Sequence, residues 1–290
     1  KALFDFDSET VSGLTMDRDG QNVFKARYTE DDGWEMYEPI IGSADPTALD
    51  PMAASLAALR VSEFIEEHPA DLSKYGLDSP RYAFEITSTE GGTFKLLLGK
   101  ERNRGEDIYA MLEGRDEVFT LGLDDFFFLD KPIDELFSVF AYIVDISEVK
   151  EIDLTMDGKT THMTLDVYMD EEGNRDNSKD KFTVNGKDAS GYDENGSQPF
   201  RKFYQALVGV TLDDIDLEGQ PSGEPEITIE YKLKDGTTMR VDFVSRDEYF
   251  YYVLRNGEYA KFIVRKNKGD VGVRGLRESY RELMDFLGLN

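Results

Sequence analysis

The residue types that most often carry enzyme chemistry are scarce in this chain. It contains no cysteine, and its only histidines are His68 and His162. The lack of cysteine removes disulfides, cysteine-ligated zinc, iron–sulfur clusters and thiol nucleophiles. A Ser-His-Asp site would have to use one of the two histidines. We therefore expect no cofactor, no tightly bound metal and no assignable catalytic residue.

Neither histidine has the neighbours that a metal or catalytic site requires. His68 follows Glu66-Glu67 at an expected helix end, where the helix dipole and the two acids would favour its charged form. His162 lies in a polar strand and is expected to be exposed or half-exposed. No second histidine or cysteine lies nearby in sequence, as a zinc site would need. Structural roles are favoured for both.

Acidic residues are too numerous to be informative one by one. The chain has 60 of them, and a glycosidase needs only two, at a fixed separation across a cleft. The acidic, turn-rich segment 170–177 could suggest calcium. It lacks the Asp-x-Asp-x-Asp-Gly spacing and a glutamate at the twelfth position. A solvated loop is the favoured interpretation, with weak calcium binding as the alternative.

A basic segment stands out in an otherwise acidic chain. Residues 261–281 hold seven bases and two acids, one of them Asp270, whereas the whole chain carries a net charge of −27. The segment could be a docking patch for a partner. The favoured alternative is an internal counter-charge to residues 213–226, which are rich in acids and contain no base.

Aromatic residues point to the same half of the chain. The run Tyr249–Tyr252 places aromatic side chains on both faces of one strand, so one face must meet something other than water. That contact could be the other half of the chain or a partner. The expected partner-facing residues are Tyr249, Tyr251, Arg265, Lys266, Lys268 and Arg274.

Composition bounds the class of protein. The chain has 290 residues, 40% of them hydrophobic and 12% aromatic, which is enough for a packed core. Its negative charge repels phosphate backbones, so we expect no nucleic-acid partner. It lacks the run of about 20 apolar residues that a membrane-spanning helix needs.

The order of sequence features repeats along the chain. Leu14-Thr15-Met16-Asp17 recurs as Leu154-Thr155-Met156-Asp157. Helical patterns open at Asp50-Pro51 and at Gln198-Pro199, and Gly-Thr turns follow at 92–93 and 236–237. Several matches in one order indicate a tandem duplication, with repeats at 1–137 and 138–290.

Each repeat is predicted to be α+β. Alternating strands are expected at 14–16, 23–28, 34–37, 83–87, 93–98, 108–112 and 118–121, joined by short turns that include Asp31-Asp32-Gly33. Strands joined by such turns must be antiparallel. A last helix over 276–287 should cover the second sheet. The expected core comprises Leu14, Phe24, Trp34, Leu56, Leu59, Phe84, Leu154, Phe203, Leu207, Ile229 and Val253.

Several phrases resemble a known family. They are Gly33–Met36 followed by Pro39 and Ala44-Asp45, then Leu72–Pro80, then Phe94–Gly99. Together they resemble the bacterial domain-of-unknown-function family 4340, over about residues 8–137. In the second repeat Leu217–Pro221 replaces the Tyr-Gly-Leu-Asp phrase. The resemblance implies an extracytoplasmic, membrane-anchored protein encoded beside ABC transporters of the gliding-motility type. It carries over no catalytic residue.

Two functions follow as hypotheses. The leading one is a non-catalytic extracytoplasmic scaffold or interaction module, accessory to an ABC-type export or surface system. Its partner would be a protein, and the resemblance implies a membrane transporter component. The start at Lys1 is consistent with an anchor segment upstream of this chain. The alternative is a sugar- or peptide-binding protein or a carboxylate-based hydrolase, with a groove between the repeats.

Overall fold

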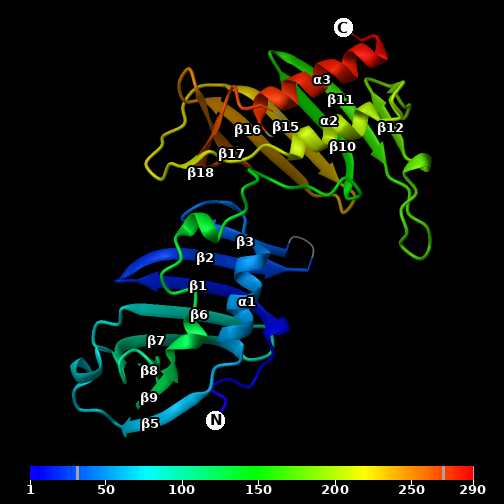
Figure 1. Ribbon diagram of the computed structural model, residues 1–290. Coiled ribbons are helices and arrows are strands. Elements are labelled where there is room, and N and C mark those ends of the chain that lie inside the picture. Colours follow the sequence, from blue (N-terminus) through cyan, green and yellow to red (C-terminus); the bar gives the residue numbers. More distant parts are fainter. Residues whose placement is uncertain (31–32, 270–271, 290) are drawn as a thin grey trace. The chain divides into compact units, whose positions relative to one another are not determined.

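The chain divides into two compact units in a computed structural model, which describes residues 1–30, 33–269 and 272–289 (Figure 1). The units are Lys1–Ser138 and Val139–Asn290. The expected boundary lay after residue 137. Residues Asp31 and Asp32 of one expected turn, and Asp270 of the basic segment, lie outside the described residues.

The first unit is built on a nine-stranded antiparallel sheet of order β4-β3-β2-β1-β6-β7-β8-β9-β5. Its strands are β1 (Val11–Arg18), β2 (Gln21–Thr29), β3 (Gly33–Glu38), β4 (Gly42–Ser43), β5 (Val61–Glu67), β6 (Tyr82–Ser88), β7 (Gly92–Arg102), β8 (Asp107–Leu112) and β9 (Glu117–Gly122). Every strand expected in the first repeat lies within one of these.

The second unit has a nine-stranded antiparallel sheet of order β13-β12-β11-β10-β15-β16-β17-β18-β14. Its strands are β10 (Val149–Met156), β11 (Lys159–Asp166), β12 (Lys181–Val184), β13 (Lys187–Asp188), β14 (Asp214–Ile215), β15 (Pro225–Leu233), β16 (Thr238–Ser245), β17 (Phe250–Arg255) and β18 (Glu258–Arg265). The strands of the two units are arranged across their sheets in the same order relative to the sequence, so that β1 corresponds to β10 and β9 to β18. The two halves are therefore similar, as the repeat predicts.

Corresponding residues also hold corresponding places in the two sheets. Met16 pairs with Phe84 across β1 and β6, and Met156 pairs with Ile227 across β10 and β15. All eleven side chains of the expected core are at most 4% exposed. Alternation of apolar and polar residues is thus a sound guide to the inner face of both sheets.

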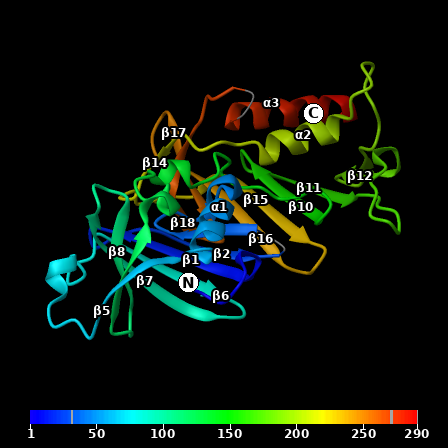
Figure 2. The same ribbon diagram turned by 60° about the horizontal axis from the view of Figure 1, so that its bottom comes forward.

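The structure has three α-helices within its described residues. They are α1 (Pro46–Ala57), α2 (Pro199–Val208) and α3 (Val273–Leu287). In both views α2 and α3 lie side by side over one face of the second sheet (Figures 1 and 2). Tyr280 of α3 shares a 2.7 Å hydrogen bond with Thr161 of β11, which ties that helix to the sheet.

The first helix begins earlier than the sequence suggests. We expected it to open at Asp50-Pro51, but α1 starts at Pro46 and contains Pro51. The Asp45 side chain accepts a hydrogen bond from the Thr47 backbone N–H and so caps the helix. Asp followed by Pro is as good a start signal at 45–46 as at 50–51, and the earlier one is used. The second helix begins at Pro199, as predicted.

The segment that ends at His68 is a strand and not a helix. β5 runs over Val61–Glu67, and His68 follows it in a left-handed conformation with φ of 52°. Its Nδ1 lies 3.4 Å from Asp116 Oδ2, and both side chains are more than three quarters exposed. The expected helix-dipole interaction is therefore wrong. His68 is part of a surface turn.

The Tyr-Gly-Leu-Asp phrase builds a small second core on the first sheet. Tyr75 and Leu77 are buried with Met111 and Val118. The Tyr75 ring packs on Tyr109 with a centroid separation of 5.0 Å. The phrase therefore has a structural role, which is to hold the β5–β6 connection against the sheet.

No helix in the described part of the chain is long and apolar enough to cross a membrane.

Candidate partner-binding surface

Tyr249 is an exposed aromatic residue of the second unit, directly before β17. Its side chain is 59% exposed. Its backbone is held on both sides, since its N–H donates to Asp247 Oδ1 at 2.7 Å and its carbonyl accepts from the Lys266 N–H at 2.8 Å. The ring is thus presented from a fixed backbone.

Two arginines lie over the ring next to Tyr249. The guanidinium carbons of Arg265 and Arg246 are 5.4 and 5.9 Å from the ring centroid of Phe250, which is cation–π distance. The Arg265 side chain is 58% exposed. We call Arg246, Tyr249, Phe250 and Arg265 the Tyr249 surface.

Tyr251 and Lys266, which the sequence assigns to the partner-facing set, lie inside the unit. Tyr251 is 3% exposed because strand alternation turns it to the core face. Its hydroxyl donates to Glu226 Oε2 at 2.5 Å, and Lys266 Nζ lies 4.4 Å from its ring centroid. Burial, together with the Glu226 hydrogen bond, raises the pKa of Tyr251 to about 12. These groups stabilise the fold.

Arg265, Lys266 and Lys268 of the basic segment act as counter-charges to acids within residues 213–226. Asp213 accepts hydrogen bonds from Lys268 Nζ at 3.2 Å and from the Arg265 N–H at 2.7 Å. Glu226 lies 3.5 Å from Lys266 Nζ. These contacts agree with the interpretation favoured from the sequence.

Arg274 is separate from this group. Its Nε lies 3.5 Å from Glu278 Oε1, one turn along α3. Of the six partner-facing candidates, Tyr249 and Arg265 are both well exposed and both adjoin Phe250, which follows Tyr249 in the chain and lies under the Arg265 guanidinium. Sequence reasoning missed Arg246, and it left Phe250 out of the partner-facing set although the aromatic run contains it. The signal for Arg246 was its position three residues before that run.

His162 takes part in a polar cluster on the outer face of the second sheet. Its Nδ1 is 2.7 Å from Asp153 Oδ1, and its side chain is 45% exposed. Lys232 Nζ lies 3.2 Å from Asp153 Oδ2 and 3.0 Å from Glu151 Oε2. The expected half-exposed strand position is confirmed.

We predict that this cluster stabilises the fold only above acidic pH. Burial acts to raise the pKa of Asp153, but hydrogen bonds from His162 and Lys232 outweigh it and lower that pKa; the Lys232 hydrogen bond lowers the pKa of Glu151. A carboxyl whose pKa is lowered in the folded state stabilises the fold at pH values above its usual pKa, near 4. This stabilisation is lost as the pH falls through the folded-state pKa.

Lys232→Met should therefore lower the melting temperature by about 1–3 °C at pH 6–7. The difference from the unmodified chain should shrink as pH falls below about 4 and through the lowered folded-state pKa values of both carboxyls. Melting curves between pH 3 and 7 measure it. A difference that stays constant with pH would assign the effect to the lysine alkyl chain and not to its charge.

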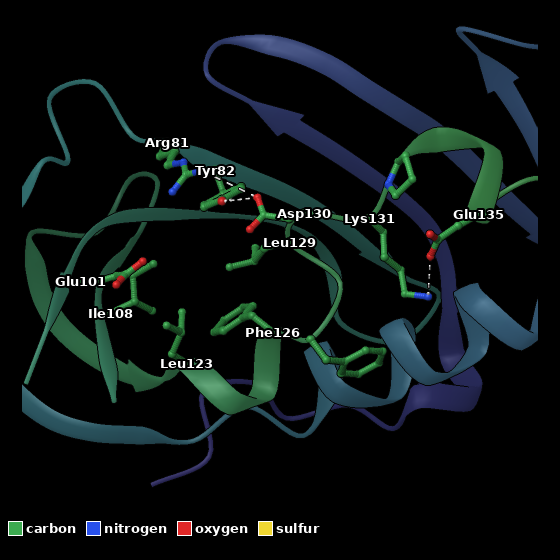
Figure 3. A pocket seen from close by; sticks show the side chains of 12 residues that line it. Arg81, Tyr82, Glu101, Ile108, Leu123, Phe126, Leu129, Asp130, Lys131 and Glu135 are labelled. Carbon is green, nitrogen blue, oxygen red and sulfur yellow. Dashed lines mark hydrogen bonds and ion pairs between the residues drawn. The ribbon is translucent and has the colours of Figure 1, made fainter. Parts of the chain in front are cut away.

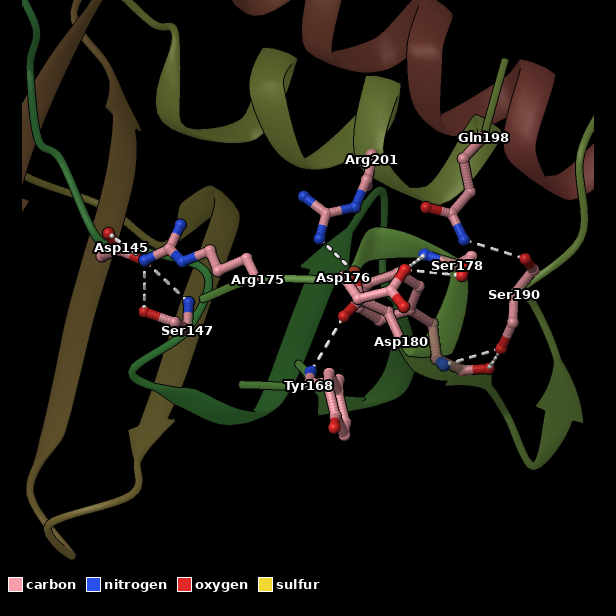
Figure 4. A network of polar contacts seen from close by, with 11 residues as sticks. Asp145, Ser147, Tyr168, Arg175, Asp176, Ser178, Asp180, Ser190, Gln198 and Arg201 are labelled. Atoms are coloured by element: carbon pink, nitrogen blue, oxygen red, sulfur yellow. Dashed lines mark hydrogen bonds and ion pairs between the residues drawn. The ribbon is translucent and has the colours of Figure 1, made fainter. Parts of the chain in front are cut away.

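The acidic loop of the second unit uses its carboxylates within the fold. Asp170 accepts hydrogen bonds from the Asn174 N–H at 2.7 Å and from the Glu172 N–H at 3.0 Å. Figure 4 shows Arg175 reaching Asp145, where its Nη2 donates to both carboxylate oxygens at 3.1 Å. Over residues 1–30, 33–269 and 272–289, no three His, Asp or Glu side chains lie together so as to hold a metal ion.

The first unit holds a pocket of about 500 Å³ beside β6 and β8 (Figure 3). The Tyr82 hydroxyl donates to Asp130 at 2.9 Å, and Arg81 lies 3.7 Å from the same carboxylate. Lys131 pairs with Glu135 at 3.5 Å. Both basic side chains of the pocket already have carboxylate partners, so it offers little net charge to a ligand.

Carboxyl groups with shifted pKa values do not point to acid–base catalysis. In the part of the chain that the structure describes, every carboxyl whose pKa departs clearly from its usual value is lowered. They are Glu66, Asp71, Asp145, Glu151, Asp153, Asp170, Asp176, Asp188, Glu226, Asp235 and Asp247. A carboxyl that acts as general acid near neutral pH needs a raised pKa.

Comparison with known proteins identifies the family. The model of a domain of unknown function, DUF4340, matches residues 34–216. The match begins at Trp34 and not near residue 8, and it continues past the unit boundary to Asp216. No curated protein and no solved structure matches. Since the matched segment covers more than half of the sequence, the chain belongs to the DUF4340 family.

Proposed function

We propose that this chain is a non-catalytic binding module and that the Tyr249 surface contacts a protein partner. The exposure of Tyr249 on a fixed backbone beside Arg265 carries the proposal. Tyrosine and arginine are the residues most enriched among those that dominate binding energy at interfaces. A fixed backbone lowers the entropy that binding must overcome.

The charge around the surface favours a specific contact over non-specific adhesion. Arg246 lies 3.6 Å from Asp216 and 3.7 Å from Asp247, so its charge is partly compensated. Arg265 is the more exposed of the two arginines, and its Nε has a longer ion pair, 4.0 Å from Asp213 Oδ1. A partner that offers a carboxylate to Arg265 and an apolar pocket to Tyr249 would complement this surface.

We predict that the double variant Tyr249→Ala with Arg265→Ala loses at least tenfold in partner recovery in a pull-down from the native host. Truncation of an interface hot spot costs about 2 kcal/mol or more of binding free energy. The loss should be greatest at low salt, where screening is least. Folding should be unchanged, since exposed substitutions cost less than about 0.5 kcal/mol.

Tyr192→Ala is the matched control, because Tyr192 is 51% exposed and lies elsewhere on the same unit. A photo-crosslinking residue at position 249, with position 192 as control, would identify the partner. Equal recovery with and without the Tyr249 surface at every salt concentration would remove that surface from the proposal. Lys266 is unsuited to the test because its substitution would disturb the Tyr251 contact.

The proposed setting is outside the cytoplasmic membrane, tethered by a segment that this chain does not contain. The family resemblance supports this location, and it supports a component of an ABC-type export or surface system as the partner. Fractionation of the native host, with protease digestion of intact spheroplasts, tests the location. Protection of the chain from protease in intact spheroplasts would contradict it.

A further inference from the structure

A second pocket lies in the second unit at the start of α2. It has a volume of about 330 Å³, and its walls come from α2, from η5 (Asn177–Lys179) and from the segment before α2. It is distinct from the Tyr249 surface, which lies at β17 and β18.

The pocket is walled by polar and aromatic groups. Three of its lining residues, Asn177, Gln198 and Gln205, carry side-chain amides, and Tyr192 also lines it. Tyr192 is 51% exposed. The loop beside it is held by Asp193, whose carboxylate accepts hydrogen bonds at 2.9 Å from two backbone N–H groups, those of Asn195 and Ser197.

Gln198 leaves a buried acceptor without a partner. The residue as a whole is only 7% exposed. Its Nε2 donates to the Ser190 carbonyl at 2.8 Å, which fixes the amide orientation because a carbonyl only accepts. Figure 4 shows the amide oxygen turned away from Ser190, towards the side of Arg201. This Oε1 has no hydrogen-bond partner among the described residues.

Arg201 supplies a buried donor in the same wall. Its Nη2 donates to Asp180, whose side chain has no exposed surface. Its Nε is buried and has no partner in the described part of the chain. Two residues that line the pocket, Gln198 and Arg201, thus hold a buried acceptor and a buried donor without a partner among the described residues. Each costs free energy until a ligand group or a water satisfies it.

The charges at the pocket favour a neutral ligand. The Arg201 guanidinium is paired with Asp180, and Lys202 Nζ lies 2.6 Å from Glu282 Oε2. A phosphate or carboxylate would find both cations already neutralised, and a carboxylate has no donor to offer Gln198 Oε1. A hydroxyl group can accept from Arg201 Nε and donate to Gln198 Oε1.

The pocket belongs to the second unit alone. Besides α2, it is formed by the connections 167–180 and 189–198, whereas the corresponding connections of the first unit are 30–32 and 44–45. Two similar sheets thus differ by two long connections that meet at one pocket. Long ordered loops on a shared scaffold are where binding sites arise.

From these observations we propose that the pocket binds a saccharide. A sugar ring stacks its C–H face on Tyr192, and its hydroxyl groups meet the three amides and the unmet pair at Gln198 and Arg201. The site is independent of the partner contact proposed above.

The test titrates the isotope-labelled chain with glucose, with N-acetylglucosamine and with the β-1,4-linked tetrasaccharide of each. The expected result is a shift of the Gln198 side-chain amide resonance, with roughly millimolar affinity for a monosaccharide and a tighter tetrasaccharide complex. Inorganic phosphate, the comparison probe, should leave that resonance unshifted.

Tyr192→Ala should weaken saccharide binding at least roughly tenfold. Tyr249→Ala, which removes a similarly exposed ring outside the pocket, should leave it unchanged. Gln205→Ala, at an exposed position of α2, provides a second variant if Tyr192→Ala alters the fold. No shift with any of the four saccharides overturns the proposal, as does a phosphate shift in place of a saccharide shift. If Tyr249→Ala loses partner recovery but still binds saccharide, the two sites act independently and both proposals are supported.

Discussion

Arg201→Ala is expected to destabilise the second unit by about 3–5 kcal/mol. The Asp180 side chain is 0% exposed, and Arg201 is its paired cation. The other carboxylate oxygen of Asp180 accepts a hydrogen bond from the Tyr168 N–H at 2.9 Å. Without Arg201, a buried carboxylate remains with one backbone hydrogen bond and no opposite charge. The cost is that of leaving a buried charge uncompensated.

Denaturant unfolding of three variants separates this cost from lost packing. Asp180→Ala with Arg201→Ala removes both charges and should cost less than the sum of the two single changes. Lys202→Ala is the matched control, one residue along α2, because the Lys202–Glu282 pair is more than half exposed on both sides. It should cost less than about 1 kcal/mol. An Arg201→Ala cost no greater than this control would contradict the assignment of a structural ion pair.

The parts of the fold that sequence reasoning found share a physical basis. Apolar residues such as Leu14 and Leu154 recur at corresponding places in the two repeats. Asp-Gly and Asn-Gly turns mark where one alternating strand ends and the next begins. The strand β5 was missed because most of its side chains are exposed and Glu63, Glu66 and Glu67 obscure any alternation. The two-residue strands β4, β13 and β14 carry no periodic signal. They form because a neighbouring strand offers hydrogen bonds.

The candidate site was harder to predict because it depends on which way a side chain points. Tyr249–Tyr252 is aromatic throughout, so alternation cannot tell which face of β17 is buried. The structure buries Tyr251 on the core face of β17, whereas Tyr249 precedes the strand and is exposed. Likewise, contacts such as Lys268–Asp213 join residues far apart in sequence. Local patterns indicate that charges must be balanced, but the partner of each charge follows only from the fold.

Leu14→Ala and Leu154→Ala are expected to destabilise their own units by similar amounts, about 3 kcal/mol each within a range of 2–5. The two leucines are 2% and 1% exposed. Leu14 pairs with Ile86 on β6, and Leu154 pairs with Ile229 on β15, so each truncation opens a cavity at the same place in its sheet. On the other side their neighbours are Ala26 and Thr161. The sites therefore differ little in size.

The single tryptophan makes the effect on each unit separable. Trp34 is the only tryptophan of the chain, lies in the first unit and is 4% exposed. Its fluorescence reports unfolding of the first unit, whereas far-ultraviolet circular dichroism reports both sheets. We expect Leu14→Ala to lower the fluorescence midpoint and Leu154→Ala to leave it unchanged while lowering part of the dichroism transition. If Leu154→Ala lowered the fluorescence midpoint as much as Leu14→Ala, the two units would unfold as one cooperative structure and their independence would be refuted.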